Sequence, residues 1–489
     1  MYNIFNAIKK NHELIFQSIN ITPMNNTARA FTAPGKAFLA GGYLVLEPIY
    51  NAYVTALSSR MHAIVKNRDS DEVPSSTITI SSPQFQEGEW KYEVDNGNLV
   101  KIPTEVKQRN NPFLEATVFT VLSYIQPKEK FNLEITIFSD PGYHSQHDTT
   151  TKLSVNKTKK FLYHSKPINA VAKTGLGSSA GLVAVVTTAL ISAFEDGTIG
   201  NLQNVIHNCS QIAHCYAQKK IGSGFDVATA VYGSIIYRRF DPGLINELFQ
   251  HGFFNSQNDE QLKQSYATAL VNLVESKWEF NNTRCTLPPG IRLLMGDIKG
   301  GSETPKLVSR VLKWKSENVS QSSELYKRLN QANLDFIDAL SSLHRFYTET
   351  PATYKDFLAY LQSTSVAVLE SNSQQTDPKL APFVNLIEAI KNIRSNLRDL
   401  TAYSGAEIEP QSQTILLDNC NEIKGCLGGM VPGAGGYDAI CLLVIEDSIN
   451  EFVDSTKQDN KFENVAWLNL HEEDDGIVEE QVNDYSGLL

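Results

Sequence analysis

Residues 173–193 constrain the fold of this chain more than any other stretch, because they join a glycine- and serine-rich loop directly to an apolar helix. The sequence there is KTGLGSSAGLVAVVTTALISA. Glycines let backbone N–H groups approach a ligand closely, and the first N–H groups of a helix lack intrahelical acceptors. The helix dipole adds partial positive charge at the same place. The stretch therefore predicts an anion site, and phosphate is the obvious anion.

The loop has two other possible interpretations. The first is a glycine-rich turn capped by a serine. The second is a dinucleotide-binding fingerprint, since Gly175, Gly177 and Ala180 have its spacing and Glu195 follows Gly175 by 20 residues. That fingerprint requires an apolar strand before the first glycine, but SKPINAVAKT stands there. The chain also contains no G-x-x-x-x-G-K-[ST] sequence, so it has no Walker loop.

Composition indicates an ordinary globular protein. The chain has 489 residues, enough for two domains, with 42% hydrophobic and 20% charged residues. A net charge of −11 argues against binding to nucleic acid. The 6 cysteines form no C-x-x-C pair, which favours reduced thiols in the cytoplasm over a zinc site. Residues 1–27 contain no long apolar run, so we expect a poorly ordered extension and no membrane anchor.

A second glycine-containing segment is RAFTAPGKAFLAGGYLVL, residues 29–46. We expect a strand over 30–33, a turn at Pro34 and Gly35, and a strand over 37–46 that contains Gly41 and Gly42. Glycines within a strand often mark close approach by a ligand or another backbone. Lys36 lies on the predicted turn, where its amine would reach a phosphate. The alternative is an ordinary solvated surface lysine.

Periodicity predicts alternating strands and helices in the rest of the first half. Strands are expected at 53–65, 77–81, 133–138, 161–164 and 234–240, and helices at 113–124 and 202–218, whereas 139–160 is expected to be an irregular surface excursion. After the second helix comes KKIGSGFD, which contains Ser223 and Asp226. Asp226 is either a helix cap or an active-site carboxylate.

The second half is expected to be richer in helices. Residues 241–286 are expected to form a linker and helical insertion. A strand is expected at 291–297, then a glycine-rich turn carrying Lys299, helices at 323–347, 355–371, 380–400 and 410–426, and a strand at 439–445. Gly433, Gly435 and Gly436 turn the chain into this last strand. The acidic tail, 471–489, is expected to fray.

Taken together, the glycine-rich segments resemble the signature motifs of the GHMP kinases. The matching segments, in order, are APGKAFLAGGYLVLE, KTGLGSSAGLV, KIGSGFDVATAVYGS, GDIKGGSETPKLV, SGAEIEPQSQT and VPGAGGYDAI. The resemblance covers about residues 29–470. Within the family it is greatest to the eukaryotic enzymes, and most of all the fungal ones, that phosphorylate (R)-5-phosphomevalonate.

The resemblance implies an α/β fold of the α+β two-layer type. An ATP-binding domain similar to domain 2 of ribosomal protein S5 would occupy residues 28–240, and a ferredoxin-like domain residues 287–470. The implied reaction transfers the γ-phosphoryl group of ATP, with Mg²⁺, to (R)-5-phosphomevalonate. It gives ADP and 5-diphosphomevalonate on the mevalonate route to isoprenoids and sterols such as ergosterol. We expect a cytoplasmic monomer, with a dimer as the alternative.

The motif match also implies roles for individual residues. Lys36 and Asp226 would face the acceptor and the transferring phosphoryl group. The other implied sites are an ATP-phosphate site at Lys173, Gly175, Leu176, Gly177, Ser178, Ser179 and Ala180, with Ser178 or Ser179 near the metal, and an acceptor site at Tyr43, Ser223, Gly433, Ala434 and Gly435. Charge alone adds Lys173, Arg238, Arg239 and Lys299 as candidates for the acceptor's phosphate.

Two departures from the family pattern bear on metal and acceptor. Mevalonate kinases carry a magnesium-binding Glu eleven residues before the catalytic Asp, and that position here is Cys215. A thiol is a poor magnesium ligand, so coordination must rely more on phosphates, water and serine hydroxyls. The first motif reads GGY at residues 41–43, where sister enzymes usually read GEH. That difference favours an acceptor other than mevalonate.

The expected chemistry depends mainly on placement and charge. Phosphoryl transfer passes through an anionic transition state that cations and N–H dipoles stabilise. The acceptor is itself a phosphate and largely ionised, so Asp226 is expected to orient groups more than to remove a proton. The competing hypotheses are a kinase that acts on mevalonate and a non-catalytic binding protein with the same fold. The presence of Lys36, Asp226 and both serines argues against the second.

Overall fold

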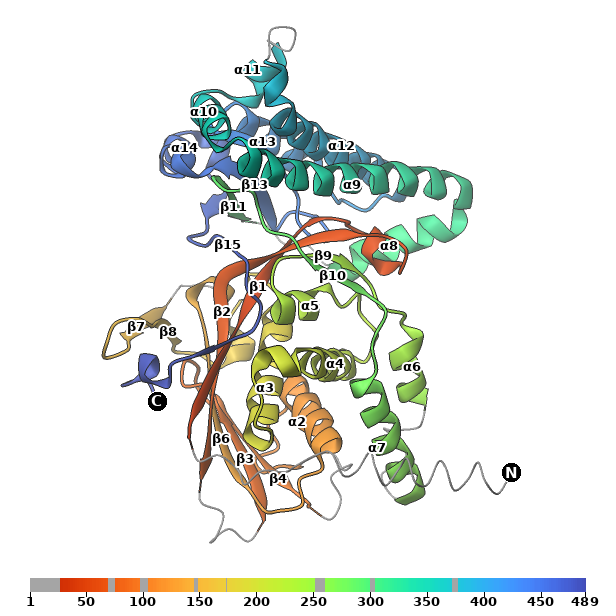
Figure 1. The fold of residues 1–489 in the computed structure, drawn as a ribbon, viewed down its shortest axis with the longest axis vertical. Coiled ribbons are helices and arrows are strands. Elements are labelled where there is room, and N and C mark those ends of the chain that lie inside the picture. Colours follow the sequence, from red (N-terminus) through yellow and green to blue (C-terminus); the bar gives the residue numbers. More distant parts are fainter. Residues whose placement is uncertain are drawn as a thin grey trace.

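A computed structural model describes residues 27–68, 75–96, 104–144, 148–172, 174–250, 260–299, 304–371 and 377–489. All but the last residue of the expected N-terminal extension lies outside this part of the chain, and so does Lys173. Helices and sheets are both abundant, as the sequence predicts. They form a lower and an upper unit stacked along the long axis of the molecule (Figure 1).

The lower unit is built on a 10-stranded sheet with the order β10-β9-β2-β6-β3-β4-β5. Off this path, β1 pairs with β2 and β16, and β15 pairs with β2. The strands are β1 (Arg29–Ala40), β2 (Ala52–Arg68), β3 (Ser76–Ser81), β4 (Glu89–Val94), β5 (Thr104–Glu105), β6 (Asn132–Ser139), β9 (Ile235–Arg238), β10 (Asn281–Arg284), β15 (Glu472–Glu473) and β16 (Val478–Glu480). Only the pair of β3 with β6 is parallel among the strand pairs described. A separate hairpin joins β7 (Thr149–Leu153) to β8 (Lys160–His164).

Apolar helices pack against this sheet. They are α2 (Pro112–Ile125), α3 (Ser178–Phe194), α4 (Ile199–Gln218) and α5 (Phe225–Tyr232). Helix α3 contacts β1 and β2 and also the other three helices, so it lies at the centre of the lower unit. Its sequence is apolar almost all round, which is typical of a fully buried helix. Helix α2 starts where Asn111 accepts a hydrogen bond from the Leu114 N–H and Pro112 occupies the first turn.

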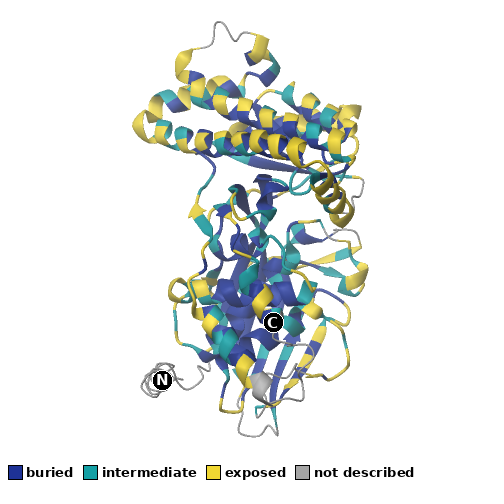
Figure 2. Cartoon of the chain, turned by 90° about the vertical axis from the view of Figure 1, so that its right-hand side faces the viewer, coloured by how far each residue is buried: buried dark blue, intermediate teal, exposed yellow. Residues whose placement is uncertain are grey.

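The upper unit is a 4-stranded antiparallel sheet with the order β12-β13-β11-β14, covered by helices. Its strands are β11 (Ile291–Ile298), β12 (Cys426–Met430), β13 (Ala439–Ile445) and β14 (Val465–Trp467). Its helices are α8 (Thr304–Glu317), α9 (Val319–Glu349), α10 (Pro351–Gln362), α11 (Val366–Ser371), α12 (Ala381–Ser404), α13 (Gln411–Asn421) and α14 (Ile449–Lys457). Exposed residues lie along the outer faces of these helices (Figure 2).

The two units share one continuous apolar core. Helix α9 contacts β2, and the Tyr53 and Phe336 rings pack with their centroids 5.7 Å apart. The region expected to be a linker, 241–286, packs on the lower unit. Helix α7 (Glu260–Glu275) packs against α4 and α2, and α6 (Gly243–Gln250) packs against α7 and, through Phe249, against Tyr216 of α4. Strand β10 extends the sheet. In the described residues no helix is both long and apolar enough to cross a membrane.

Several local predictions are wrong. Pro34 and Gly35 form no turn, because β1 continues through them and takes up the irregularity as a shift in its register with β2. The strand then ends at Ala40, and a 3₁₀ helix, Leu44–Leu46, follows the two glycines. The stretch 139–160 is only partly irregular, since β7 lies within it. Two helices replace the one expected over 355–371, and β12 takes the end of the helix expected over 410–426.

The C-terminal segment does not fray as expected. It runs from the upper unit down beside β1 to the lower unit (Figure 1), where β16 pairs with β1 and β15 with β2. The buried Arg60 guanidinium donates to Glu473 at 2.7 Å and to the Gly476 carbonyl oxygen. Tyr485 is fully buried against Phe138 and His62. Many acidic side chains predict solvation, but here strand pairing, the Glu473 carboxylate and the Tyr485 ring hold the segment in place.

Candidate active site

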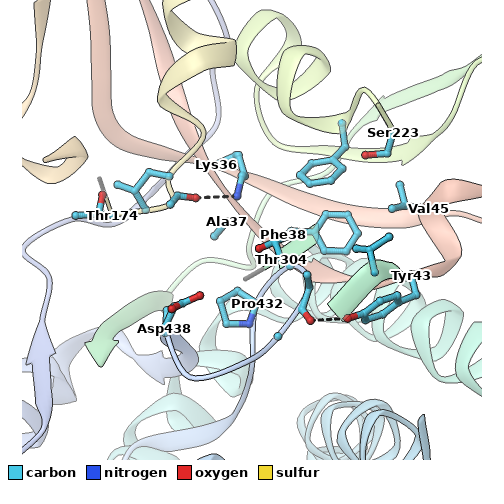
Figure 3. A pocket seen from close by; sticks show the side chains of 18 of the residues that line it. Lys36, Ala37, Phe38, Tyr43, Val45, Thr174, Ser223, Thr304, Pro432 and Asp438 are labelled. Atoms are coloured by element: carbon cyan, nitrogen blue, oxygen red, sulfur yellow. Dashed lines mark hydrogen bonds between the residues drawn. The ribbon is translucent and has the colours of Figure 1, made fainter. Parts of the chain in front are cut away.

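A cavity of about 310 Å³ lies where the two units meet (Figure 3). The lower unit contributes one wall, from strand β1, the loop at 174–176 and the start of α5. The upper unit contributes the other, from strand β11, the start of α8 and the loop at 432–435. Among the described residues, its lining is Lys36, Ala37, Phe38, Tyr43, Val45, Leu46, Thr174, Gly175, Leu176, Ser223, Phe225, Met295, Thr304, Val308, Pro432, Gly433, Ala434, Gly435, Asp438 and Ala439.

Lys36 is the basic residue of this lining. Its backbone N–H donates to the Leu176 carbonyl oxygen at 3.0 Å, and its Nζ donates to the Gly175 carbonyl oxygen at 3.1 Å (Figure 3). Burial lowers the pKa of the Lys36 ammonium, and the negative charge of Asp226 acts in the opposite direction. Lys36 is therefore not an ordinary solvated lysine: it ties β1 to the glycine loop.

The glycine loop is anchored at its start and left-handed at two positions. Thr174 donates from its N–H to the Tyr143 carbonyl oxygen at 3.2 Å and from its hydroxyl to the Gly142 carbonyl oxygen at 2.6 Å. Gly175 and Gly177 have φ of 77° and 84°. A Cβ atom at Gly177 would lie 3.2 Å from Cγ of Lys36. Glycine at this position thus provides both the backbone conformation and room for the lysine.

Helix α3 begins with Gly177 as its N-cap, and its start has no side-chain cap. The serine-cap interpretation of the loop is therefore wrong. The first backbone bond of the helix runs from the Ala180 N–H to the Gly177 carbonyl oxygen, so the N–H groups of Ser178 and Ser179 precede the intrahelical ladder. Ser178 and Ser179 line a second cavity, of about 410 Å³, which Trp90 and Phe113 also line. The loop therefore lies between two cavities.

Asp226 lies in the first turn of α5, but it is not the cap, because Gly224 with φ of 84° holds that position. Asp226 Oδ1 accepts from the Val227 N–H at 3.0 Å. Its Oδ2 lies 3.9 Å from Nε2 of His214, which is buried on α4. The same nitrogen lies 3.1 Å from the Ser179 hydroxyl oxygen. His214 therefore lies between the glycine loop and the carboxylate.

Sequence reasoning missed His214. A lone histidine within an amphipathic helix usually belongs to a packed interior, and the nearby chain carries no other signal. Its neighbour Cys215 stands where mevalonate kinases carry the magnesium-binding Glu. It is a buried thiol whose Sγ accepts from the Gln211 amide at 3.5 Å. Burial raises the pKa of Cys215, which disfavours the thiolate that a metal would need. In the described part of the chain, no group of 3 or more His, Cys, Asp or Glu side chains is arranged to hold a metal ion.

The first and last glycine segments meet across the cavity. Tyr43 Oη donates to the Ala434 carbonyl oxygen at 2.8 Å (Figure 3), and the Gly433 N–H donates to the Phe38 carbonyl oxygen at 3.1 Å. At Gly435, φ is 74° and a Cβ would lie 2.2 Å from the Ile408 carbonyl oxygen. The loop therefore needs glycine there to pass so close to a neighbouring backbone.

The remaining predicted residues differ in where they lie: Ser223 lines the cavity, Arg238 and Lys299 are exposed, and Arg239 is buried. The Ser223 side of the cavity is fixed by Tyr237, whose hydroxyl donates to the Ser223 carbonyl oxygen at 2.8 Å. Arg238 and Lys299 are exposed and are not among the described residues that line the cavity. Arg239 is buried and donates to the carbonyl oxygens of Leu46 and Gly222, each at 2.7 Å. Its hydrogen bonds therefore go to backbone that flanks the cavity.

Comparison with known proteins agrees with this geometry. Residues 154–234, which contain the glycine loop and Asp226, match the GHMP kinases N terminal domain. The chain is 55% identical to phosphomevalonate kinase of Candida albicans over 94% of its own length and 100% of that protein. It is 33% identical to phosphomevalonate kinase of Gibberella zeae, over 94% of this chain and 98% of that one.

A solved structure has the same fold. The chain superimposes on Streptococcus pneumoniae phosphomevalonate kinase in complex with phosphomevalonate and AMPPNP with a TM-score of 0.53. The alignment covers 91% of this chain and 99% of that one, at 16% identity. At that identity the likeness shows the fold alone.

Proposed function

The chain belongs to the phosphomevalonate kinase family of the GHMP kinases, and from this we propose how its residues transfer a phosphoryl group. It is an ATP-dependent phosphotransferase, and its acceptor is (R)-5-phosphomevalonate. We propose that the donor and acceptor phosphates meet beside Lys36, at the cavity between the two units.

The observation that supports this most strongly is the contact between Lys36 and the glycine loop. Nζ lies 3.1 Å from the Gly175 carbonyl oxygen, immediately before the helix start that carries two N–H groups outside the ladder. A transferring phosphoryl group spreads negative charge over its oxygens, and fixed cations and N–H dipoles stabilise that charge most effectively where water is excluded. Lys36 and the start of α3 supply both.

We propose that ATP lies with its phosphates on the loop and its nucleoside in the second cavity. That cavity is adjacent to Ser178 and Ser179 and is lined by the rings of Trp90 and Phe113. Aromatic faces suit a purine base, whereas the helix N-terminus suits the phosphates. The acceptor would then enter from the other side of the loop, along the walls formed by Tyr43 and Ala434.

We propose that Asp226 orients the reacting groups. Its charge acts on Lys36 and favours the ammonium form. One carboxylate oxygen is held by the Val227 N–H. The acceptor phosphate is largely ionised near neutral pH and carries no obligatory proton for a base to remove. Holding Lys36 charged is therefore the more useful task for this carboxylate.

The donor set also fits Mg²⁺ bound mainly through ATP. Magnesium in kinases takes one or two protein oxygens and completes its shell with phosphates and water. The Ser179 hydroxyl and the Asp226 carboxylate approach the same imidazole nitrogen, at 3.1 and 3.9 Å, so both oxygens lie in one neighbourhood. We propose that Ser179, with Ser178 and Asp226 beside it, holds the ion, which would neutralise phosphate charge.

The remaining proposals concern organisation. We propose an ATP-binding domain at 28–240, an insertion at 241–286 and a second domain at 287–470, since β11–β14 form their own sheet. We also propose that a monomer is active, because one chain supplies both walls of the cavity. A cytoplasmic location is supported by 6 free thiols, most of them buried.

The test is an acceptor panel with the full chain. ADP release is measured with ATP, excess Mg²⁺ and one acceptor at a time: phosphomevalonate, mevalonate, galactose or homoserine. We expect kcat/KM for phosphomevalonate to exceed every other value by a wide margin. Efficient phosphorylation of mevalonate would overturn the proposed acceptor, and binding of ATP without turnover on any acceptor would overturn catalysis itself.

A further inference from the structure

The proposed reaction assigns no role to the side chain of His214. It lies on α4 with its side chain 4% exposed, and Phe113 packs against its ring with the centroids 5.5 Å apart. Two polar side chains lie within hydrogen-bond distance of its Nε2: the Ser179 hydroxyl at 3.1 Å and the Gln218 amide nitrogen at 3.2 Å. The imidazole therefore faces the start of α3.

The Gln218 side chain presents its amide nitrogen to Nε2, and an amide nitrogen can only donate. We therefore assign to Nε2 the lone pair of the neutral imidazole. The single lone pair of Nε2 is then shared by two donors, the Gln218 amide at 3.2 Å and the Ser179 hydroxyl at 3.1 Å. A serine hydroxyl has one proton and two lone pairs. Once its proton is held by His214, the lone pairs of Ser179 are turned away from α4.

We propose that His214 is a positioning residue that fixes the Ser179 hydroxyl as a donor and so presents its oxygen to the metal of the metal–nucleotide complex. The inference rests on the proposed function and adds a residue to it. Asp226 remains available in this arrangement, because an unprotonated Nε2 has no hydrogen to give to Oδ2 at 3.9 Å.

The neighbouring residues explain why this task falls to His214. Cys215 is turned toward Gln211 on its own helix and is buried, so it does not supply the oxygen ligand that a carboxylate would give at that position. Metal coordination must then rely more on the serine oxygen. That oxygen can bind a metal ion only if the hydroxyl proton points away from the ion. Side chains that orient a metal ligand in this way typically contribute about ten- to a hundredfold to metal affinity.

The experiment measures binding of the ATP analogue AMPPNP by calorimetry, with and without Mg²⁺, and no acceptor is added. The quantity compared is the ratio of the two dissociation constants. In His214→Leu, which keeps volume but cannot accept a hydrogen bond, we expect the preference for the Mg²⁺ form to fall about tenfold or more. His214→Gln retains an acceptor and should keep most of the preference. His207→Gln is the matched control, because His207 is a buried histidine of the same helix that contacts Asn208 instead.

A double mutant distinguishes positioning from general damage. Ser179→Ala should lower the same ratio, and adding His214→Leu to it should change the ratio no further, because the hydroxyl that His214 orients is gone. Additive losses, or an unchanged ratio in His214→Leu, would overturn the inference. Because no acceptor is present, failure of the proposed acceptor specificity would leave this result intact. If His214→Leu does not fold, His214→Phe, whose ring also cannot accept a hydrogen bond, takes its place in both measurements.

Discussion

The two walls of the cavity differ in kind. The lower unit brings the charge and the helix start, through Lys36, the glycine loop and nearby Asp226. The upper unit brings Met295, Val308 and a loop of proline, glycine and alanine, with Thr304 and Asp438 as its polar side chains among the described residues. The difference predicts that the two walls act on different kinetic parameters. Changes to the lower wall should lower kcat, whereas changes to the upper wall should act on KM for the acceptor.

The largest expected effect follows Lys36→Met, which removes the cation but keeps the length of the side chain. Loss of a preorganised charge at a transition state typically costs a hundred- to a thousandfold, so we expect kcat to fall by about that factor. Steady-state assays with both substrates saturating measure it. Lys313→Met is the control, because that side chain is 75% exposed on α8. A near-normal kcat in Lys36→Met would show that the charge of Lys36 does not stabilise the transition state.

A pH profile tests the same cation without substitution. Burial lowers the pKa of Lys36, so its ammonium loses its proton at a lower pH than a free lysine, whose ordinary value is 10.5. Activity should therefore be complete on the acid side of that pKa and decline as the pH rises through it, below pH 10.5. In Lys36→Arg, whose guanidinium stays charged, the alkaline decline should be absent. An equal decline in both enzymes would assign it to another group.

Asp226→Asn should cost less than a missing general base. Removing such a base costs roughly a hundred- to ten-thousandfold, and we expect a loss of about a hundredfold. The pH dependence of the variant should follow the acceptor phosphate, whose second pKa is about 6. We would measure kcat across pH with phosphomevalonate saturating and Mg²⁺ in excess. A loss far beyond ten-thousandfold in a folded variant that binds ATP would restore Asp226 as the base.

A matched pair of glycines tests whether the upper wall works through backbone shape. Both Gly433 and Gly435 have positive φ, 66° and 74°, but a Cβ at Gly433 meets nothing within 4 Å. At Gly435 it would lie 2.2 Å from a backbone oxygen. The conformational strain alone costs about 1 kcal/mol, so Gly433→Ala should lose that much in unfolding free energy and Gly435→Ala clearly more. Denaturant unfolding gives the first comparison, and acceptor KM, which should rise more in Gly435→Ala, gives the second.

The smallest expected effect is that of Tyr43→Phe. It removes only the hydrogen bond from Tyr43 Oη to the Ala434 carbonyl oxygen. A hydrogen bond of this kind contributes about 0.5–1.5 kcal/mol net, which corresponds to roughly a two- to tenfold change. Tyr43 follows β1 on the lower unit, but this bond holds the upper wall's loop through Ala434, so we expect KM for the acceptor to rise by that factor with kcat nearly unchanged. A fall in kcat with KM unaltered would contradict the division between the walls.

Local signals correctly predicted the elements that follow two of the glycine-rich loops. The loop and helix at the start of α3 and the strand β13 are where the pattern of glycine and apolar residues places them. Misreadings arose where tertiary pairing decides the conformation. Pro34 and Gly35 favour a turn by themselves, yet long strand partners carry β1 through them. In β12 the sequence CLGGM has two glycines, so its strand character comes from the neighbour β13.

The sequence also predicted part of the candidate site. Motif residues such as Lys36 and Tyr43 line the cavity, because sequence neighbours in a strand or loop stay together. Arg238 and Lys299 were chosen by charge alone, and charge does not say which way a side chain faces. His214 reaches Ser179 across 35 positions of sequence through the packing of α3 on α4. Only the assembled helices reveal it.

The C-terminal segment bears on how the chain folds as it is made. Strand β1 leaves the ribosome early, but its partner β16 is translated about 450 residues later, as the Arg29–Glu479 contact records. Until then one edge of β1 is open and the Arg60 guanidinium lacks its partners at Glu473 and Gly476. An open edge invites pairing with other chains, and contacts so distant in sequence form slowly. The strand that carries Lys36 is thus completed only once the segment containing β16 has been made, and until then its open edge can pair with other chains.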